Sequence, residues 1–412
     1  MELHARSIDD DLLSSAAIRD PNAYFGQLRQ EDPVHWNASQ KAWILTSYDD
    51  VVSVCRRPDL FSSDKLGFNV SQLSESDREE YRDRYPAIFA AYPHVLSAVD
   101  NPIHEHFRSI VNQVWTPLHI EKRRARIRSF VHELLDQWQE KDKVDFIKDF
   151  SLELPLKVIL DFLGLPDGDW REVKAYSDQW RTFHFGSGAD PARWQSGVEG
   201  ITGLVGFVAP RIRERKEKPA NDYISSLLQA EWKGHRLSDD QVRVHCATMI
   251  LAGHAPTTNL LANGLHLLLS NRDQWDRIHE DPALLRSAVE EIIRLEGSIK
   301  CMIRYAIEDT HIGDKKIRKG DLVLLVNTAA NSDPAKFVNP RSVDVGRRPN
   351  AHVGFGQGIH ICLGAPLARI EAHETYLALN QRFPSMRLAT EAVEYHPILR
   401  ARALKDLPIL LR

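Results

Sequence analysis

The chain has 412 residues, of which 43% are hydrophobic and 27% are charged, and its formal net charge at pH 7 is −4. These values are ordinary for a globular protein and exclude the basic footprint of a nucleic-acid-binding protein. No apolar run is long enough for a membrane-spanning helix, and residues 1–4 show no signal-peptide pattern. The four widely spaced cysteines fit no zinc motif and suit a reducing compartment, so we expect a cytoplasmic protein without a membrane segment.

The first hundred residues predict a mixed region. A short helix is expected near residues 24–30, followed by a hairpin whose strands are Val34–Trp36 and Ala42–Leu45. A helix over Ser47–Arg56 comes next. Residues 61–99 are irregular and heavily charged, which predicts a solvated loop with one short helix.

A pair of cationic or donor side chains follows at the start of the next predicted helix, which Pro102 opens. His104 and Arg108 are four residues apart, so they lie on one helical face. Two such groups side by side suit a carboxylate. As an isolated pair they would be an ordinary surface pair.

A basic run occupies residues 121–128, Glu-Lys-Arg-Arg-Ala-Arg-Ile-Arg. Such a run is commonly a solvated helix face. The functional alternative is a docking surface for an acidic electron-transfer protein, because long-range charge attraction speeds such an encounter. The sequence leaves both interpretations open.

Residues 144–270 predict helix after helix, with breaks at 164–166, 186–191 and 218–219. The segment Asp169–Phe185 is rich in aromatic residues, most of which we expect in the core. We find no internal repeat and no low-complexity linker, so residues 1–412 are predicted to form a single domain.

The longest apolar-periodic run covers residues 237–271 and opens with Ser238 and Gln241, a capping-box spacing. Its centre reads Ala252-Gly253-His254-Ala255-Pro256-Thr257. Pro256 has no N–H to donate to the Ala252 carbonyl, and proline inside a helix costs about 3 kcal/mol. We therefore predict a kink with an orphan carbonyl, compensated by a hydroxyl, a water or a ligand beside a local cavity.

The stretch 349–373 carries the most specific pattern in the chain. Gly356 and Gly358 can adopt the positive φ angles of a tight loop. Cys362 follows, just before a helix predicted over 363–383, and Pro366 suits that helix's first turn. A helix N-terminus stabilises a thiolate over a thiol, and Gly364 leaves room for a flat group. A thiolate in this setting is a candidate axial ligand for haem iron.

The whole string, Phe355-Gly356-x-Gly358-x-His360-x-Cys362-x-Gly364, resembles the cysteine-ligand loop of the cytochrome P-450 family. It continues into a Leu-Ala-Arg-x-Glu helix typical of the family's soluble bacterial members. The resemblance covers roughly residues 20–410. It implies a mostly helical, triangular fold with small β-sheets and a haem b whose iron is bound by Cys362.

The same resemblance implies roles for further residues. Haem propionates would be held by His104, Arg108, Arg304 and His360. Glu291, Arg294 and Arg347 resemble the family's buried Glu–Arg–Arg cluster, which secures the loop leading to the cysteine. Segments expected to line a substrate pocket contribute a mixed apolar set, namely Leu96, Phe183, Thr248, Met249, Ile299 and Met302.

The central helix departs from the family pattern. Members carry Ala-Gly-x-acid-Thr, in which the acid and the alcohol relay protons to the oxygen being activated, whereas this chain has Ala255 and Pro256 at those two places. Water, His254, a neighbouring threonine or the substrate can replace the missing groups. Peroxide users of the family that bind fatty acids place an arginine where Ala255 stands, so anchoring of that kind is not expected.

The sequence therefore predicts a haem-thiolate oxidoreductase that oxidises a small organic molecule. The favoured reaction is monooxygenation with electrons from a ferredoxin and ferredoxin reductase-type donor. A peroxide-driven, radical-coupling or isomerising reaction is the first alternative, because the relay is missing. A non-catalytic haem protein that only binds a ligand is the second, and the absence of a sensor or output domain counts against it.

Overall fold

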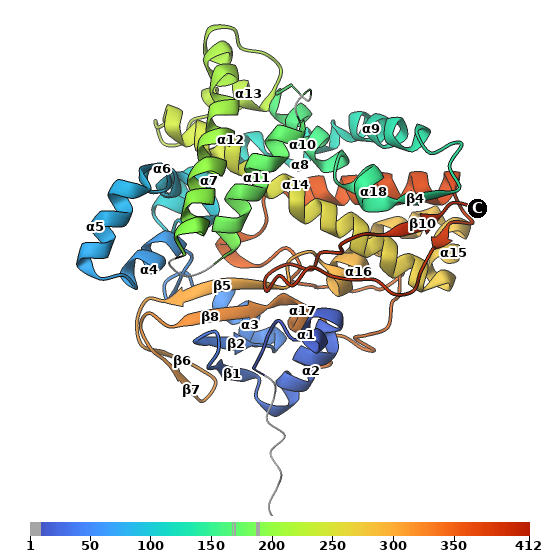
Figure 1. Cartoon of the computed structure of the whole chain (residues 1–412), viewed down its shortest axis with the longest axis horizontal. Helices are drawn as coiled ribbons and strands as arrows, with labels where there is room; N and C mark the ends of the chain where they lie inside the picture. The colour runs from blue at the N-terminus through green and yellow to red at the C-terminus, as the bar shows by residue number, and fades with distance from the viewer. Residues whose placement is uncertain (1–9, 167, 169, 187–189) are drawn as a thin grey trace, which may run out of the picture. The chain divides into compact units, whose positions relative to one another are not determined.

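The structure is a computed structural model that describes residues 10–166, 168, 170–186 and 190–412. The protein is mostly helical with small β-sheets, which confirms the predicted fold class (Figure 1). Predictions for residues 1–4, for Asp169 and for part of the break at 186–191 fall outside the described residues. No helix in the described ranges is long and apolar enough to cross a membrane.

Backbone contacts divide the chain into two compact units. Unit 1 contains residues 1–62, 259–362 and 380–412, and unit 2 contains residues 63–258 and 363–379. Two helices run from one unit into the other, α14 (Asp239–Ser270) and α18 (Ala365–Arg382). The expectation of a single domain stays a prediction.

The elements of unit 1 come from both ends of the chain and its middle. They are α1 (Ser15–Arg19), α2 (Pro21–Glu31), β1 (Val34–Asn37), β2 (Ala42–Leu45), α3 (Tyr48–Cys55), β3 (Phe61–Ser62), α15 (Arg272–Glu280), η4 (Pro282–Leu284), α16 (Leu285–Glu296), β5 (Cys301–Ala306), β6 (Thr310–Ile312), β7 (Lys315–Ile317), β8 (Leu322–Val326), α17 (Asn327–Asn331), η5 (Gly358–His360), β9 (Arg387–Leu388) and β10 (Pro408–Leu410).

Unit 2 is almost wholly helical. Its elements are α4 (Lys65–Ser71), α5 (Glu75–Arg84), α6 (Pro86–Ala91), η1 (Tyr92–His94), η2 (Leu96–Ala98), α7 (Ile103–Val114), α8 (Pro117–Glu121), α9 (Arg124–Asp136), β4 (Lys143–Asp145), the π-helix η3 (Ile147–Ser151), α10 (Leu154–Leu163), α11 (Trp170–Phe185), α12 (Pro191–Glu217) and α13 (Tyr223–Gln229).

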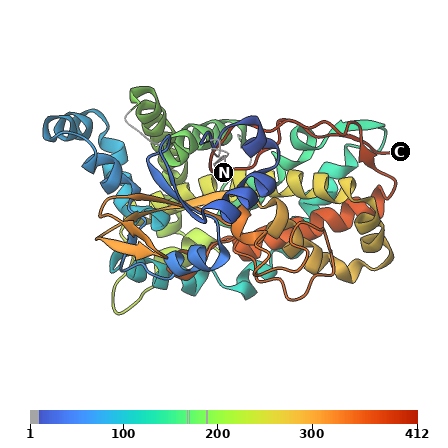
Figure 2. The same ribbon diagram turned by 90° about the horizontal axis from the view of Figure 1, so that it is seen from below.

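A five-stranded sheet organises unit 1, with the strand order β1-β2-β8-β5-β3 (Figures 1 and 2). Strands β1 and β2 pair antiparallel, which confirms the predicted hairpin. Strand β8 then runs parallel to β2 and antiparallel to β5. The sheet thus joins segments more than 250 residues apart in the sequence.

Strand β5 sends its side chains alternately to two hydrophobic clusters. Cys301 and Ile303 belong to the cluster that includes Leu28 and Val326, while Met302 packs against the other cluster. This is the period-two alternation of a strand with both faces covered. It places Met302 and Arg304 on the same face of β5.

The contact between α11 and α12 in unit 2 depends on small residues. A Cβ on Gly200 would lie 2.3 Å from the Trp180 backbone nitrogen, and one on Gly197 would lie 2.7 Å from Phe183. The two helices therefore approach more closely than larger side chains would allow. Two of the five aromatic residues of α11, Trp180 and Phe183, are fully buried, and the other three are half-buried, so the expectation that most of them lie in the core is confirmed only in part.

The long helix α14 begins where the sequence predicted. The Ser238 N–H donates to Gln241 Oε1 at 2.8 Å, and the Gln241 N–H donates to Ser238 Oγ at 3.2 Å. These reciprocal bonds are a capping box. The helix continues through Pro256 to Ser270; the predicted bend and the state of the Ala252 carbonyl stay predictions.

The prediction for residues 61–99 was wrong, because this segment folds into α4, α5, α6 and two short 3₁₀ helices. Helix α5 buries none of its side chains, so it carries no apolar stripe that periodicity could detect. Its start is capped by Ser74, whose side chain accepts from the Asp77 N–H. Acidic residues in its first turn and arginines in its last turn complement the helix dipole.

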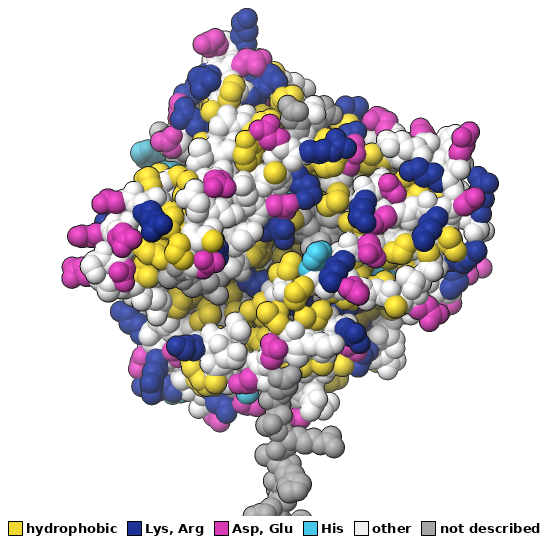
Figure 3. Space-filling view, in the orientation of Figure 1, with side chains coloured by type: hydrophobic (Ala, Val, Ile, Leu, Met, Phe, Trp, Pro, Cys, Tyr) yellow, Lys and Arg dark blue, Asp and Glu magenta, His cyan; other side chains and the backbone are white. Residues whose placement is uncertain are grey.

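The surface is of mixed charge. On the face in Figure 3, acidic and basic side chains are interspersed. This distribution agrees with the small formal net charge of −4; the expectation that nucleic acid is not a partner stays a prediction.

Candidate active site

Cys362 lies at the end of a loop whose backbone is tightly defined. The Cys362 N–H donates to the Phe355 carbonyl at 2.9 Å. Gly356 and Gly358 have φ angles of 74° and 72°, as the sequence predicted. A Cβ on Gly358 would lie 2.1 Å from the Cys55 carbonyl oxygen, so only glycine fits there. The loop therefore holds the cysteine at a fixed place before α18.

Of the four cysteines, all within the described ranges, Cys362 is exposed and the other three are buried. Burial raises the pKa of the Cys246 thiol to about 12 and raises the pKa values of Cys55 and Cys301. Those three thiols are poor ligands in this state because a metal ligand is a thiolate. Among the four, Cys362 alone is exposed and lies just before a helix N-terminus. The first turn of that helix is formed by the Ala368 N–H, which donates to the Gly364 carbonyl at 3.0 Å.

A buried charge cluster supports the approach to this loop. Both carboxylate oxygens of Glu291 accept from Arg294, at 2.7 and 2.8 Å, and from Arg347, at 3.0 and 3.1 Å. Asn350 also donates to Glu291 at 3.1 Å. Glu291 and Arg294 are fully buried, and Asn350 follows Pro349 at the start of the loop. The structure thus brings the three predicted cluster residues together.

The β5 face that carries Met302 and Arg304 meets the cysteine loop. The Met302 sulfur lies 3.2 Å from the position that a Cβ on Gly356 would take. Arg304 is 8% exposed, and one of its Nη atoms donates to the Ile303 carbonyl at 2.7 Å. His360 forms the end of η5, two residues before Cys362. Unit 1 therefore presents a thiol and two donor side chains around one loop, a donor set that fits a haem with its propionates.

In unit 2, His104 and Arg108 lie on α7, four residues apart as predicted. His104 is 2% exposed, whereas Arg108 is half-buried and donates through Nε to Asn112 Oδ1 at 3.1 Å. The chemistry of this pair suits a carboxylate, so it also fits the predicted propionate role.

The centre of α14 combines an open face with a buried one. Ala252 is exposed, while Gly253, Ala255 and Pro256 are half-buried. His254 points to the opposite side and is 1% exposed. Ala252 is thus exposed in the middle of a long helix; the local cavity that the sequence predicted next to the proline stays a prediction.

Two buried polar groups near Pro256 lack hydrogen bonds. Within the described residues, neither ring nitrogen of His254 makes a hydrogen bond of ordinary geometry, although the Leu152 backbone is close enough to raise the pKa of the ring; Thr258 Oγ1 has no partner either. Thr257 is buried as well. A buried polar group without a partner typically costs about 1–3 kcal/mol, so these positions stand out from an ordinary helix core.

His254 interacts electrostatically with a charged group on α11. Burial lowers the pKa of His254 to about 4, although the Asp178 carboxylate opposes that shift; Lys174 and Arg181 lower it further. Asp178 itself pairs with Lys174 at 2.5 Å and with Arg181 at 3.1 Å. Burial alone would raise the pKa of Asp178, but the hydrogen bond from Lys174 and the nearby charges lower it. His254 is therefore neutral at pH 7 and faces an ionised acid.

The predicted pocket residues fall into two sets. In unit 2, Leu96 and Met249 are 8% exposed, and Thr248 Oγ1 donates to the Val244 carbonyl at 2.7 Å. Phe183 packs edge-on against Tyr92 and Trp194, with ring centroids 5.3 and 5.0 Å away. These contacts make Phe183 a core residue, and its pocket role stays a prediction. Ile299 and Met302, in unit 1, are half-buried.

The basic run at 121–128 is largely neutralised by its own chain. Arg124 and Arg128 both bind Glu374 on α18, at 2.5 and 2.8 Å, and Arg126 binds Asp161 at 3.2 Å. Burial would raise the pKa of Glu374, but hydrogen bonds from His373, Arg128 and Arg124 lower it to about 2. These pairs favour the structural interpretation of the run over a docking surface.

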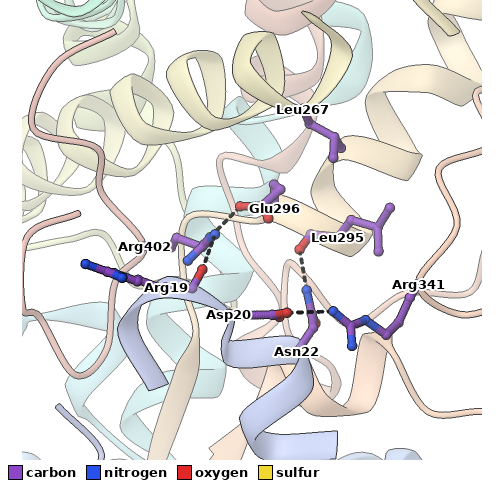
Figure 4. A pocket seen from close by; sticks show the side chains of 8 residues that line it. All are labelled: Arg19, Asp20, Asn22, Leu267, Leu295, Glu296, Arg341 and Arg402. Atoms are coloured by element: carbon purple, nitrogen blue, oxygen red, sulfur yellow. Dashed lines mark hydrogen bonds and ion pairs between the residues drawn. The ribbon is translucent and has the colours of Figure 1, made fainter. Parts of the chain in front are cut away.

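Unit 1 also contains a cavity of about 280 Å³ away from the cysteine loop (Figure 4). Four of its five charged side chains pair with each other. Arg341 binds Asp20 at 2.6 Å, Arg402 binds Glu296, and Asn22 donates to the Leu295 carbonyl. We interpret this cavity as a joint between the N-terminal helices and the C-terminal segment.

Two residues of interest were missed by the sequence analysis. Asp178 is visible in the sequence only as part of a Lys174–Asp178–Arg181 helix pattern, typical of a solvated face. Lys300 is 4% exposed. The only indication of this in the sequence is that the lysine interrupts the apolar run 299–303. Neither signal reveals what the side chain faces.

Comparison with known proteins identifies the family of this chain. A sequence model described as Cytochrome P450 matches residues 199–386. Cytochrome P450 CYP107DY1 of Priestia megaterium is 33% identical over 97% of this chain and 98% of its own. The structure of P450BioI bound to a fatty-acyl carrier protein has a TM-score of 0.87, with 30% identity over 96% of this chain and 98% of that one. The testosterone complex of CYP109E1 from Bacillus megaterium has a TM-score of 0.82, with 28% identity over 95% of this chain and 98% of that one.

Proposed function

The chain belongs to the cytochrome P450 family, and from that premise we propose that it is a haem b monooxygenase with a ferredoxin-type electron donor. That it is a P450 monooxygenase-type oxidoreductase acting on small molecules follows from the family. The observation that carries the proposal is Cys362, the one exposed cysteine of the four, on a glycine loop before a helix. The donor is proposed from the resemblance alone, and a cytoplasmic location from the cysteine usage.

Cys362 would bind the haem iron, and Arg304 and His360 in unit 1 together with His104 and Arg108 in unit 2 would hold the propionates. When bound, a thiolate-ligated haem supplies oxygen activation, since electron donation from the thiolate favours O–O cleavage. The Glu291 cluster would keep the loop at 349–361 in place, because Asn350 and Arg347 both donate to that carboxylate. We also propose that the two units together form a single P450 domain.

Proton supply is the step for which this chain needs its own solution. Ala255 and Pro256 carry no exchangeable side-chain proton. His254, one residue earlier, is a neutral imidazole that can both accept and donate a proton. We place it with Asp178 as the chain's replacement for the missing acid and alcohol, because the two groups interact and Asp178 is only partly buried. A proton entering at Asp178 would then pass to His254 on the buried side of the helix.

A second function is favoured by the same helix. A peroxide-driven reaction needs no delivery of protons from the protein, since hydrogen peroxide brings its own protons and electrons. Ala255 and Pro256 therefore favour the peroxide-driven reaction as the second candidate. No separate observation supports a radical-coupling reaction, an isomerising reaction or ligand binding without turnover.

The first test is the carbon monoxide difference spectrum of the reduced protein. Wild type should give the Soret band of thiolate ligation, and Cys362→Ala should abolish it. Cys246→Ala is the matched control, because Cys246 is buried and its thiol is protonated at neutral pH; this variant should keep the band. A thiolate spectrum that survives Cys362→Ala would overturn the proposal.

A further inference from the structure

Lys300 is a buried lysine in the short segment between α16 and β5 of unit 1. It is 4% exposed, Cys301 beside it is 3% exposed, and Ile299 is half-buried. Lysine is almost never fully buried unless an acidic group pairs with it. The position therefore calls for a physical explanation.

The backbone on both sides of Lys300 is fixed. Its N–H donates to the Arg400 carbonyl at 2.9 Å, and its carbonyl accepts from the Thr328 N–H at 3.3 Å. Ile299, one residue earlier, forms an antiparallel bridge with Ala401. Because hydrogen bonds to Arg400 and Thr328 fix the backbone of Lys300, the backbone also fixes the direction in which its side chain leaves.

Strand alternation gives that direction. Cys301 and Ile303 face one hydrophobic cluster, and Met302 faces the other. In an extended chain, residues two apart share a face, so Lys300 lies on the side of Met302 and Arg304. That is the side on which Met302 approaches Gly356 of the cysteine loop.

Lys300 has no acidic partner. Among the described residues, its Nζ forms no hydrogen bond and no ion pair. The charged group that acts on it, Arg402, is also a cation, and Arg402 is itself paired with Glu296 and stacked 3.9 Å above the Tyr395 ring. Burial lowers the pKa of Lys300 to about 8, and Cys301 and Arg402 act on it in opposite directions. At pH 7 most of the lysine is still protonated.

We infer that Lys300 binds an anionic group of the substrate, specifically a carboxylate, so that the substrate is a small organic acid with an apolar body. Ile299 and Met302 on either side offer the apolar surface for that body. The inference rests on the proposed function. Lys300 and Arg304 are four positions apart along extended chain, a span of roughly 13 Å, so the bound anion is distinct from the propionate assigned to Arg304.

A charge-assisted pair at a desolvated site is strong because removing one partner leaves the other charge buried alone. A carboxylate should therefore bind more tightly than a neutral amide of the same shape, by about 10-fold to 100-fold. The preference should depend on the charge at position 300 and not on the length of the side chain.

The experiment compares 4-phenylbutanoate with 4-phenylbutanamide by isothermal titration calorimetry at pH 7, using the haem-loaded full chain. Wild type should prefer the acid by the factor above. Lys300→Met should bind the two equally, and Lys300→Arg should restore the preference. Lys316→Met is the matched control, since Lys316 is exposed and pairs with Asp309 on the surface; it should leave the preference unchanged.

The inference is overturned if wild type does not prefer the acid, if neither compound binds, or if Lys300→Met keeps the preference. It is also overturned if Lys300→Met loses haem without any change in the preference, because Lys300 would then serve the cofactor. Failure of the proposed function is visible separately, since the carbon monoxide spectrum of wild type would lack the thiolate band whatever the calorimetry gave.

Discussion

The cysteine loop and the centre of α14 differ in how far their buried polar groups are hydrogen-bonded. In the support of the loop, the buried carboxylate of Glu291 receives hydrogen bonds from Arg294, Arg347 and Asn350. In α14, both nitrogens of His254 lack a hydrogen bond of ordinary geometry within the described part of the chain. The first region is built to hold one geometry, because removing any partner leaves a charge buried.

The second region keeps polar groups whose partners must come from elsewhere, such as water or a bound molecule. Pro256 adds to this, since it removes a helix donor at the same place. The difference agrees with the proposal that the loop would hold a permanent cofactor, whereas the middle of α14 would contact water or substrate. Three predictions follow from this contrast, and each changes one side of it.

The largest effect is expected for Glu291→Gln. The change removes the negative charge between two arginines, of which Arg294 is fully buried. Breaking a buried pair in this way typically costs about 3–5 kcal/mol of folding free energy. Urea unfolding followed by circular dichroism would measure it, together with the haem content of the purified protein.

The control for that change is Asp276→Asn, which breaks the exposed Arg272–Asp276 pair. Exposed pairs are worth about 0–1 kcal/mol, so the control should shift the unfolding midpoint little. Equal effects of the two variants would contradict the idea that the Glu291 cluster stabilises the loop.

The next effect is expected in turnover, for the double variant Ala255→Glu with Pro256→Thr. It adds an acid and an alcohol at the positions that now carry none, and acid–base assistance is typically worth about 10²–10⁴-fold. Reductase-supported turnover, or product formed per reductant consumed, should rise more than peroxide-supported turnover. A wild type that is already tightly coupled, and that the double change leaves unimproved, would show that His254, water or substrate supplies the protons; the peroxide alternative would then be dropped.

A smaller effect concerns acid stability and His254. Burial lowers its pKa from 6.5 to about 4 in the folded chain, so between those two pH values the unfolded state binds more protons. Folding stability is therefore lost as pH falls through that window, by an amount on the order of 1–3 kcal/mol from this residue. His254→Gln should flatten the loss, as urea unfolding at pH 7 and pH 5 would show.

The exposed residue His311 provides the comparison for that experiment. His311→Gln should leave the slope of stability against pH as it is in wild type. If His254→Gln and His311→Gln behave alike, His254 is not held neutral in the folded protein, and its pairing with Asp178 in proton transfer loses its basis.

Local chemistry in the sequence was sufficient for several features of the structure. The capping box of Ser238 and Gln241 was predicted at the start of α14 and is present there. The hairpin of β1 and β2 and the positive φ angles of Gly356 and Gly358 were also predicted. Each of these depends on residues a few positions apart, because caps, turns and glycine conformations are decided by neighbouring backbone groups.

Tertiary structure decided the rest, since partners far away in the chain determine burial and charge. Arg124 and Arg128 look like a free basic surface until Glu374, about 250 residues later, neutralises them. Helix α5, with no apolar stripe, is recognisable only once it is folded. The burial of Lys300, a lysine without an acidic partner among the described residues, follows from β-pairing of distant segments. By itself the sequence determined which cysteine is the candidate cofactor ligand, because the loop motif is local; only the packing of distant segments decided which polar groups are buried, because desolvation is a property of the whole fold and not of the local chain.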